Sequence, residues 1–250
     1  ATWRGIIRES RNHHSIVEYV GGNEIGWQIT DQHHPLLTLM KKVAAEENDR
    51  VFRAACPDAG AKHSPWMFDI RNTYRHYDSV ETMRYGEFGS CSPAVLDAWQ
   101  RDIPPASQWP VNLDDPILIR KNIAQAVFTK NMWSNKADIE WAFAPENLAD
   151  FIRAGQYLGA EGLRYAYDAL RRKGKRIGGM TNHCYSEPWP NGAGSGMVDF
   201  DGRTYLNYDF FKQALAPIAL SLQFDSAIYQ PDDGIKTELF LVSDAPAAAT

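Results

Sequence analysis

Short apolar runs alternate with longer helical segments along most of this 250-residue chain, and this alternation constrains its fold most. Neighbouring parallel strands need a crossover connection, which is usually a helix, so a β-then-α order predicts a parallel α/β architecture. The order holds as far as Pro217. Because 44% of the residues are hydrophobic, the chain can build a substantial core and is not a disordered one.

Five segments before Pro217 have the composition of short strands. They span residues 15–20, 51–55, 72–76, 82–85 and 176–181, and a loop that carries His63 is expected after the second. A closed (β/α)8 barrel needs eight strands. Two interpretations therefore stay open: either the chain holds only part of a barrel, or its fold is not a barrel.

Helical periodicity predicts the segments between these strands. One expected helix ends at Asn12, and a second follows a cap at Asp31. Four more cover residues 93–99, 117–127, 146–172 and 208–215. The helix over 146–172 has the strongest pattern, because Pro145 precedes it and Gly174 follows it. Residues 186–202 are rich in turn formers.

The pattern changes after Pro217. Leu220, Leu222 and Phe224 alternate with polar residues, and residues 237–242 form a second strand-like run. Alternation with a period of two is typical of an antiparallel sheet with one buried face. We therefore predict two domains: a partial (β/α)8 barrel over residues 1–216, and the start of an Ig-like β-sandwich over residues 217–250.

Charge and cysteine content exclude several classes of protein. A net charge of −5 argues against a general nucleic-acid binder. Cys56, Cys91 and Cys184 are too far apart for a zinc motif and too few for a disulfide framework, so we interpret them as small buried hydrophobes. The histidine pairs 13–14 and 33–34 lack a third ligand at a fixed spacing, so neither a metal nor another cofactor is predicted.

No membrane partner is predicted, because no apolar stretch has the length of a membrane span. The chain begins at Ala1-Thr2-Trp3-Arg4, without an initiator methionine or a signal-peptide pattern. We therefore expect a trimmed or excised piece of a longer polypeptide. The sequence leaves its compartment open.

Two glutamates follow strand-like runs and lie beside glycine. They are Glu24, in Gly21-Gly22-Asn23-Glu24, and Glu87, in Gly86-Glu87-Phe88-Gly89. Barrel enzymes keep their catalytic groups at the carboxyl ends of the strands. A pair of carboxylates is the usual equipment for hydrolysis of a glycosidic bond. The two glutamates are therefore the leading candidates for a catalytic pair.

A resemblance to a known family covers nearly the whole chain. Arg11–Val17 with Gly21–Glu24, and Gly86–Gly89 with Ser92-Pro93, resemble the two catalytic segments of glycoside hydrolase family 2. The nearest branch is that of the β-mannosidases and exo-β-glucosaminidases. Three further segments agree in order with the end of that family's barrel: residues 151–172, 178–190 and 198–203.

The resemblance implies a retaining exo-β-glycosidase that acts on a carbohydrate substrate without a cofactor. Glu24 would be the general acid/base, Glu87 the nucleophile, and Asn23 a hydrogen-bond partner of the sugar's 2-hydroxyl. The chain would hold barrel strands four to eight. In a retaining enzyme the two carboxyl groups lie about 5–5.5 Å apart.

Further substrate contacts are predicted with alternatives. Before Glu87, either His76 or its neighbour Tyr77 could contact the substrate. Tyr85 lies two residues before Glu87, so it should face the same way as Glu87 or pack in the core. His183, Glu187 and Trp189 follow the last barrel strand, where they could bind sugar or pack within the fold. His183 stands where the family usually has tryptophan, so the identity of the sugar stays open.

Two other functions remain possible on sequence alone. The substrate could be a different sugar, such as a β-galactoside or a β-glucuronide, and for the latter Arg84 and Arg75 are weak candidates for pairing with the acid. Alternatively, the chain could be a non-catalytic fragment or subunit. Half a barrel leaves a sheet edge exposed, so such a fragment should associate with itself or with the missing N-terminal barrel segment.

Overall fold

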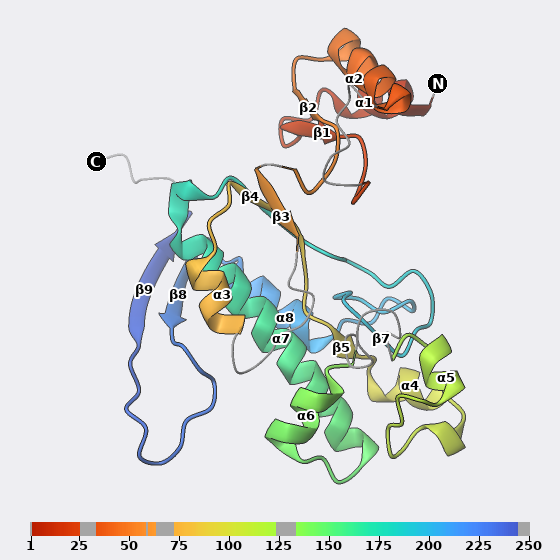
Figure 1. Cartoon of the computed structure of the whole chain (residues 1–250), viewed down its shortest axis with the longest axis vertical. Coiled ribbons are helices and arrows are strands. Elements are labelled where there is room, and N and C mark those ends of the chain that lie inside the picture. The colour runs from red at the N-terminus through yellow and green to blue at the C-terminus, as the bar shows by residue number, and fades with distance from the viewer. Residues whose placement is uncertain (1, 26–33, 59, 64–72, 124–133, 245–250) are drawn as a thin grey trace. The chain divides into compact units, whose positions relative to one another are not determined.

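The computed structural model describes residues 2–25, 34–58, 60–63, 73–123 and 134–244 (Figure 1). The chain divides into two compact units. The first unit contains Ala1–His63 and Thr82–Glu87, and the second contains Ser64–Glu81 and Phe88–Thr250.

The described residues of the first unit form two pairs of parallel strands and two helices. Its elements are α1 (Thr2–Ser10), β1 (Glu18–Val20), α2 (Pro35–Glu47), β2 (Val51–Arg53), β3 (Ala61–His63) and β4 (Arg84–Phe88), of which the last residue belongs to the second unit. Strand β1 pairs with β2, and β3 pairs with β4. Parallel pairing requires the helical crossover that α2 provides between β1 and β2.

Helices α1 and α2 pack beside the first strand pair. Ile7, Tyr19 and Ala44 form a buried cluster that joins α1, β1 and α2. At the end of α2, Glu47 accepts hydrogen bonds from Arg4 and Arg8 of α1. The apolar contacts and these ion pairs together hold the two helices against the strands.

Backbone pairing continues beyond β1 and β2. The Gly21 nitrogen donates to Arg53, the Cys56 nitrogen donates to Gly22, and the Glu24 nitrogen donates to Cys56. A Cβ on Gly21 would lie only 2.8 Å from the Ala54 carbonyl oxygen, so this close approach requires glycine. The extended pairing places Glu24 beside Cys56.

Helix α7 (Leu148–Arg172) organises the second unit. It begins at Asn147, whose side chain accepts a hydrogen bond from the Asp150 nitrogen at 3.0 Å. Most of its residues are buried around the whole circumference, as expected of a helix that is covered on all sides. The other elements of this unit are α3 (Thr73–Ser79), β5 (Ser92–Pro93), α4 (Leu96–Asp102), η1 (Pro105–Ser107), α5 (Pro116–Arg120), α6 (Lys136–Phe143), η2 (Gly174–Arg176), β6 (Met180–Asn182), β7 (Ala193–Gly194), α8 (Leu206–Ala214), β8 (Ile218–Gln223) and β9 (Glu238–Ser243).

Strands β8 and β9 form the antiparallel pair that the alternation after Pro217 predicts. Arg172 at the end of α7 joins this pair to α3. Its guanidinium donates to Asp78 at 2.6 Å and to the Ser221 hydroxyl, and it lies over the Phe240 ring. Asp78 also accepts a hydrogen bond from the Tyr165 hydroxyl at 2.6 Å.

Three predictions of secondary structure are wrong. Residues 73–79 are helical where a strand was expected, because Tyr74 is fully buried and packs edge-to-face on Tyr165 of α7. Pro93 belongs to β5, which pairs with β7, and the helix begins only at Leu96. His63 ends strand β3 and does not lie in a loop. Tertiary packing overrides local propensity in segments this short.

The other boundaries agree with the sequence analysis to within a few residues, and α6 is an additional helix. Helix α2 begins at Pro35, and the expected cap at Asp31 lies outside the described residues. The segment over 117–127 is helical only to Arg120, and residues beyond 123 are not among those described.

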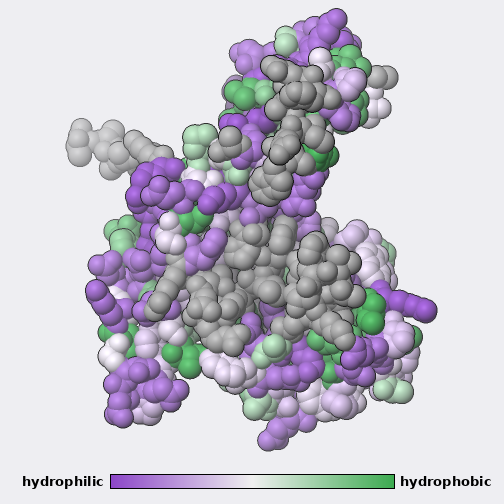
Figure 2. Space-filling model, viewed as in Figure 1, coloured by the Kyte–Doolittle hydropathy of each residue, from purple (hydrophilic) through white to green (hydrophobic). Residues whose placement is uncertain are grey.

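The mixed α/β architecture is confirmed. The sheets among the described residues are small, and no closed barrel is present among them. No helix in this part of the chain is long and apolar enough to cross a membrane. On the face shown in Figure 2, hydrophobic residues are scattered among hydrophilic ones.

Candidate active site

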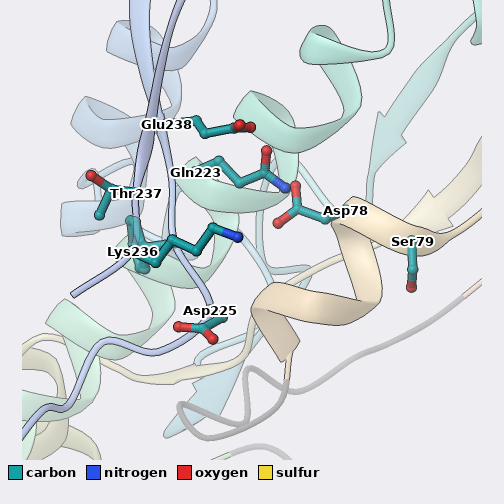
Figure 3. Close-up of a pocket in the computed structure, with 8 residues that line it drawn as sticks. Asp78, Ser79, Gln223, Asp225, Lys236, Thr237 and Glu238 are labelled. Carbon is teal, nitrogen blue, oxygen red and sulfur yellow. The ribbon is translucent and has the colours of Figure 1, made fainter. Parts of the chain in front are cut away.

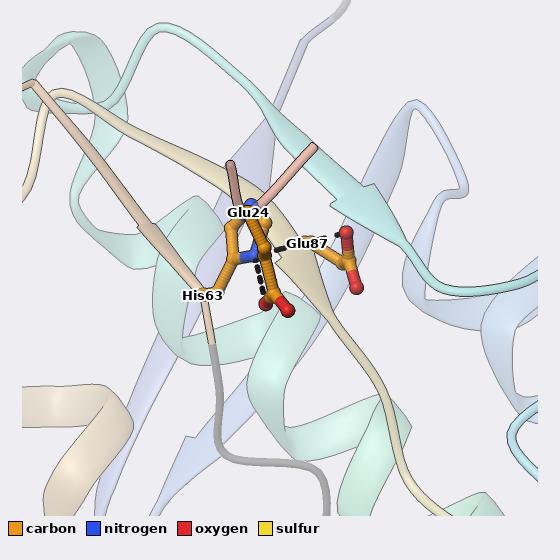
Figure 4. A group of neighbouring side chains, drawn as sticks. All are labelled: Glu24, His63 and Glu87. Atoms are coloured by element: carbon orange, nitrogen blue, oxygen red, sulfur yellow. Dashed lines mark hydrogen bonds and ion pairs between the residues drawn. The ribbon is translucent and has the colours of Figure 1, made fainter. Parts of the chain in front are cut away.

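Three side chains of the first unit meet at the carboxyl ends of strand segments. Glu24 follows β1, His63 ends β3, and Glu87 lies near the end of β4 (Figure 4). Parallel pairing of β3 with β4 sets His63 opposite Glu87, and Glu24 approaches His63 from the end of the separate β1–β2 pair. Glu24 itself has a φ of 46°, a left-handed conformation that few non-glycine residues adopt.

The histidine lies between the two carboxylates. His63 Nδ1 is 2.8 Å from Glu24 Oε1 and 3.7 Å from Glu87 Oε2. One donor atom from each of the three side chains lies within 4.8 Å of the other two. The side chain of Glu24 is 54% exposed, that of Glu87 is 15% exposed and that of His63 is 5% exposed. Glu24 is thus exposed to solvent, whereas Glu87 is largely buried and the imidazole is buried.

Cys56 supports the imidazole from its other side. His63 Nε2 lies 3.1 Å from Cys56 Sγ. Burial raises the pKa of the Cys56 thiol, so the group stays protonated at neutral pH. A Cβ on Gly86 would overlap Cys56 Sγ, so the glycine before Glu87 makes room for the thiol. The expectation that Cys56 is a small buried residue is confirmed, but its contact with His63 was not foreseen.

An ion-pair network holds the other ends of the same strands. Arg84 at the start of β4 pairs with Glu18 at the start of β1, and both Arg84 and Arg53 pair with Asp58. Burial alone would raise the pKa of Asp58, but hydrogen bonds from Arg53 and the Gly60 nitrogen lower it overall. Arg84 is therefore engaged in this network, and the side chain of Arg75 lies outside the described part of the chain.

The strand that carries Glu87 is irregular. Lys62 pairs with Tyr85, but the next residue, His63, pairs with Glu87, so β4 holds one extra residue at this point. Tyr85 is only 1% exposed, and burial raises the pKa of its hydroxyl to about 12. The expected alternation that would place Tyr85 and Glu87 on one face is broken here.

The remaining predicted residues fall in two groups. Asn23 lies in the first unit, where its backbone forms a bridge with Cys56. His76, His183, Glu187 and Trp189 belong to the second unit. His76 is exposed on α3 against Tyr77, and His183 is exposed with Nδ1 3.1 Å from the Ser195 hydroxyl.

Glu187 and Trp189 differ in burial. Glu187 is 7% exposed and accepts hydrogen bonds from the Asn191 side chain at 2.6 Å and the Gly196 nitrogen at 2.5 Å. Its carboxylate therefore holds the loop over residues 187–196 in place. Trp189 is 38% exposed and keeps a ring surface in contact with solvent.

Sequence reasoning missed His63 and its contacts. The run Gly60-Ala61-Lys62-His63 contains no Val, Ile, Thr, Tyr, Phe or Trp, so it carries no strand signal. Its partners Glu24 and Glu87 lie on other strands. The pairing of β3 with β4 sets His63 beside Glu87, and the backbone pairing beyond β1 and β2 sets Glu24 beside Cys56, and neither pairing has a local sequence signal.

The second unit has a separate hollow between α3 and the end of β8. It has a volume of about 450 Å3. In Figure 3 the side chains of Asp78 and Gln223 point toward one another across it, with Lys236 nearby. Asp78 already accepts hydrogen bonds from Tyr165 and Arg172, so it serves mainly to join α3 to α7.

Known structures resemble this chain in fold. A β-D-mannosidase from Dictyoglomus thermophilum superposes with a TM-score of 0.76 at 18% identity, over 97% of this chain and 31% of the mannosidase. The exo-chitosanase CsxA of Amycolatopsis orientalis superposes with a TM-score of 0.62 at 14% identity, over 90% of this chain and 28% of that enzyme. A variant of the same enzyme, in complex with PNP-β-D-glucosamine, superposes with a TM-score of 0.62 at 17% identity, over 90% of this chain and 28% of that enzyme.

Sequence comparison adds no relative. No protein-family model matches the chain, and no curated protein matches it. The chain spans less than a third of the length of these neighbours, at 31% and 28%. It therefore shares the fold of one part of these β-glycosidases.

Proposed function

We propose that this chain carries the catalytic carboxylates of a retaining exo-β-glycosidase related to the β-mannosidases. The main support is the convergence of Glu24 and Glu87, which present carboxylate oxygens within 4.8 Å of one another. Retaining glycosidases hold their carboxyl groups about 5–5.5 Å apart, whereas inverting enzymes leave about 6.5–9.5 Å for a water molecule. A pair of oxygens within 4.8 Å is closer than the inverting range and so supports the retaining class.

The roles follow from the chemistry of this class. Glu24 donates a proton to the leaving glycosidic oxygen while Glu87 attacks the anomeric carbon to form a covalent glycosyl-enzyme. Glu24, now ionised, takes a proton from water, which displaces Glu87 and restores the starting configuration. The exposed Glu24 side chain suits proton exchange with water and with the leaving group, and the more buried Glu87 suits a fixed nucleophile.

His63 holds the pair. When Glu24 is ionised, its oxygen accepts a hydrogen bond, so His63 Nδ1 carries the proton at the 2.8 Å contact. The contact with Cys56 keeps the ring in this orientation. Asn23 precedes Glu24 on the same segment, and we propose that its amide contacts the sugar's 2-hydroxyl.

We also propose that the chain is one part of a (β/α)8 barrel followed by the start of a sandwich. The parallel pairs β1–β2 and β3–β4 correspond to consecutive strands of a (β/α)8 barrel, of which the chain would hold strands four to eight. The hairpin β8–β9 would begin the following sandwich. The fold shared with part of a β-D-mannosidase supports this view.

The test is hydrolysis of a panel of aryl β-glycosides, including mannoside, glucosaminide, galactoside and glucuronide. Glu24→Ala and Glu87→Ala should each lower turnover by at least about 100-fold. Azide should restore turnover with opposite product stereochemistry in the two variants, because it replaces the base-activated water in one and the nucleophile in the other. Glu146→Ala, which removes an exposed glutamate of the second unit, is the control.

A second proposal concerns the completeness of the fold. It is favoured by the small sheets and by the fact that the chain covers less than a third of each neighbour. The chain could need a complementary segment before it is active. In that case the purified chain should self-associate in sedimentation and should be inactive on every glycoside. A compact, monomeric and active chain would exclude this alternative.

A further inference from the structure

Glu24, His63 and Glu87 offer a set of donor atoms that resembles a metal site. Their three donor atoms lie within 4.8 Å of one another, and each comes from a different strand segment. His63 Nδ1 is 2.8 Å from one carboxylate and 3.7 Å from the other. Because the His63 side chain is only 5% exposed, its position is fixed by packing inside the protein.

The second ring nitrogen of His63 is already engaged. Metal-bound histidines usually donate the N–H of the other ring nitrogen to a neighbour, which fixes the tautomer and the ring orientation. Here Nε2 lies 3.1 Å from Cys56 Sγ, a weak acceptor. A bound ion would replace the Nδ1 proton that faces ionised Glu24 in the free chain, with the ring proton then on Nε2, which donates it to sulfur.

The donor types favour zinc over hard cations. Zinc binds histidine nitrogen and carboxylate oxygen at about 2.0–2.2 Å, so ligand atoms in a tetrahedral site lie about 3.4 Å apart. This separation falls between the two measured contacts of His63 Nδ1. Magnesium and calcium prefer sites made of oxygen alone. Three protein ligands would leave the fourth zinc position to water.

We propose that Glu24, His63 and Glu87 bind one zinc ion, and that zinc and sugar compete for the same two carboxylates. Metal ligands bind in their deprotonated forms, so two carboxylates and an imidazole that hold the ion would carry a charge that a divalent cation neutralises. Zinc binding does not require that the chain be a glycosidase. In an active enzyme the ion would act as an inhibitor, because it occupies both the acid/base and the nucleophile.

The test is calorimetric titration of Zn2+ into the purified full chain after treatment with a chelator. One site with micromolar affinity is expected. His63→Ala and Glu87→Gln should each weaken binding at least tenfold, because each removes a strong ligand. Cys56→Ala should weaken it by about tenfold, the lower end of the effect of a group that only orients a ligand, because it removes only the support of the ring.

Matched controls separate this site from surface binding and from unfolding. His13→Asn/His14→Asn removes an exposed histidine pair of the same unit and should leave affinity unchanged. Circular dichroism should show that each variant keeps the helical content of the parent chain.

Two results would overturn the proposal: zinc binding weaker than about 1 mM in the parent chain, or equal affinity in the parent chain and folded His63→Ala. The outcome is independent of hydrolysis. A chain that binds zinc but cleaves no glycoside supports the zinc site and contradicts glycosidase activity of the chain by itself. A chain that cleaves glycosides without binding zinc supports the glycosidase and contradicts the zinc site.

Discussion

His63 Nδ1 lies 2.8 Å from Glu24 Oε1, so the last residue of β3 holds the more exposed of the two site carboxylates. The same nitrogen is 3.7 Å from Glu87. A buried histidine with a structural partner on its other nitrogen thus connects both members of the proposed catalytic pair. Any change that moves this ring should act on both carboxylates at once.

Substitution of His63 should reduce glycosidase turnover more than substrate binding. In His63→Gln we expect kcat for an aryl β-glycoside to fall by about 10- to 100-fold with little change in KM, because Glu24, the proposed acid/base, loses the group that orients it. Lys62→Gln alters the exposed neighbour on the same strand and should keep parental kinetics. Parental kcat in His63→Gln would contradict a positioning role.

A methyl group at position 86 should disturb the site through Cys56. In Gly86→Ala the new Cβ would overlap Cys56 Sγ, and overpacking of this kind destabilises proteins by about 1–3 kcal/mol. Cys56→Ala removes the sulfur, so the double variant should recover most of the loss. Urea unfolding of the parent, both single variants and the double variant measures this coupling. Strictly additive effects would show that the two residues do not interact.

Loss of Asp78 should destabilise the second unit strongly. In Asp78→Ala, Arg172 keeps a side chain that is 5% exposed but loses its carboxylate partner, and Tyr165 loses an acceptor. Removal of one member of a buried ion pair typically destabilises by about 3–5 kcal/mol. Thermal and urea unfolding should show this loss.

The matched control for this prediction is Arg153→Ala. Arg153 is 78% exposed and lies 3.5 Å from Asp150, so its removal should change stability by no more than about 1 kcal/mol. Similar losses of unfolding free energy in Asp78→Ala and Arg153→Ala would show that the Arg172–Asp78 pair contributes no more to stability than an exposed ion pair does.

Glu47 should make the first unit sensitive to acid. Hydrogen bonds from Arg8 and then Arg4 lower the pKa of Glu47 from 4.5 to about 2. Because the folded state binds the proton more weakly than the unfolded state, this contribution to stability is complete above about pH 4.5. It is lost as the pH falls toward 2.

The measurement is thermal unfolding of the parent chain and Glu47→Gln between pH 2 and 7. The difference in Tm should be largest at neutral pH and should shrink as the pH approaches 2. Glu9→Gln removes one exposed negative charge from α1 and controls for net charge. A difference between parent and Glu47→Gln that is constant with pH would contradict the assignment.

Long periodic segments were predictable from the sequence, whereas short ones were not. Helix α7 repeats its apolar pattern over 25 residues, so packing and local propensity agree. The segment over 73–79 is short and rich in aromatic residues, which suits a strand equally well. Its helical state depends on the burial of Tyr74 against Tyr165, a contact between residues that are far apart in the chain.

The candidate site was predictable in part. Glu24 and Glu87 each follow a strand-like run and lie beside glycine, and this local pattern pointed to both residues. His63 and Cys56 have no local pattern, and the irregular pairing of β3 with β4 changes which neighbours of Glu87 face outward. Contacts that depend on strand register are set by backbone pairing between distant segments.

The order of apolar and polar residues therefore determined the α/β character of the chain, its longest helix and the antiparallel strands after Pro217, and the motifs around Glu24 and Glu87 made them the candidate pair. The tertiary structure decided that His63 lies between those glutamates, that Cys56 supports it and that Tyr85 is buried in the core. The reason is physical: local periodicity encodes which face of an element is apolar, but the approach of side chains depends on how separate strands align. That alignment is fixed only when the whole unit packs.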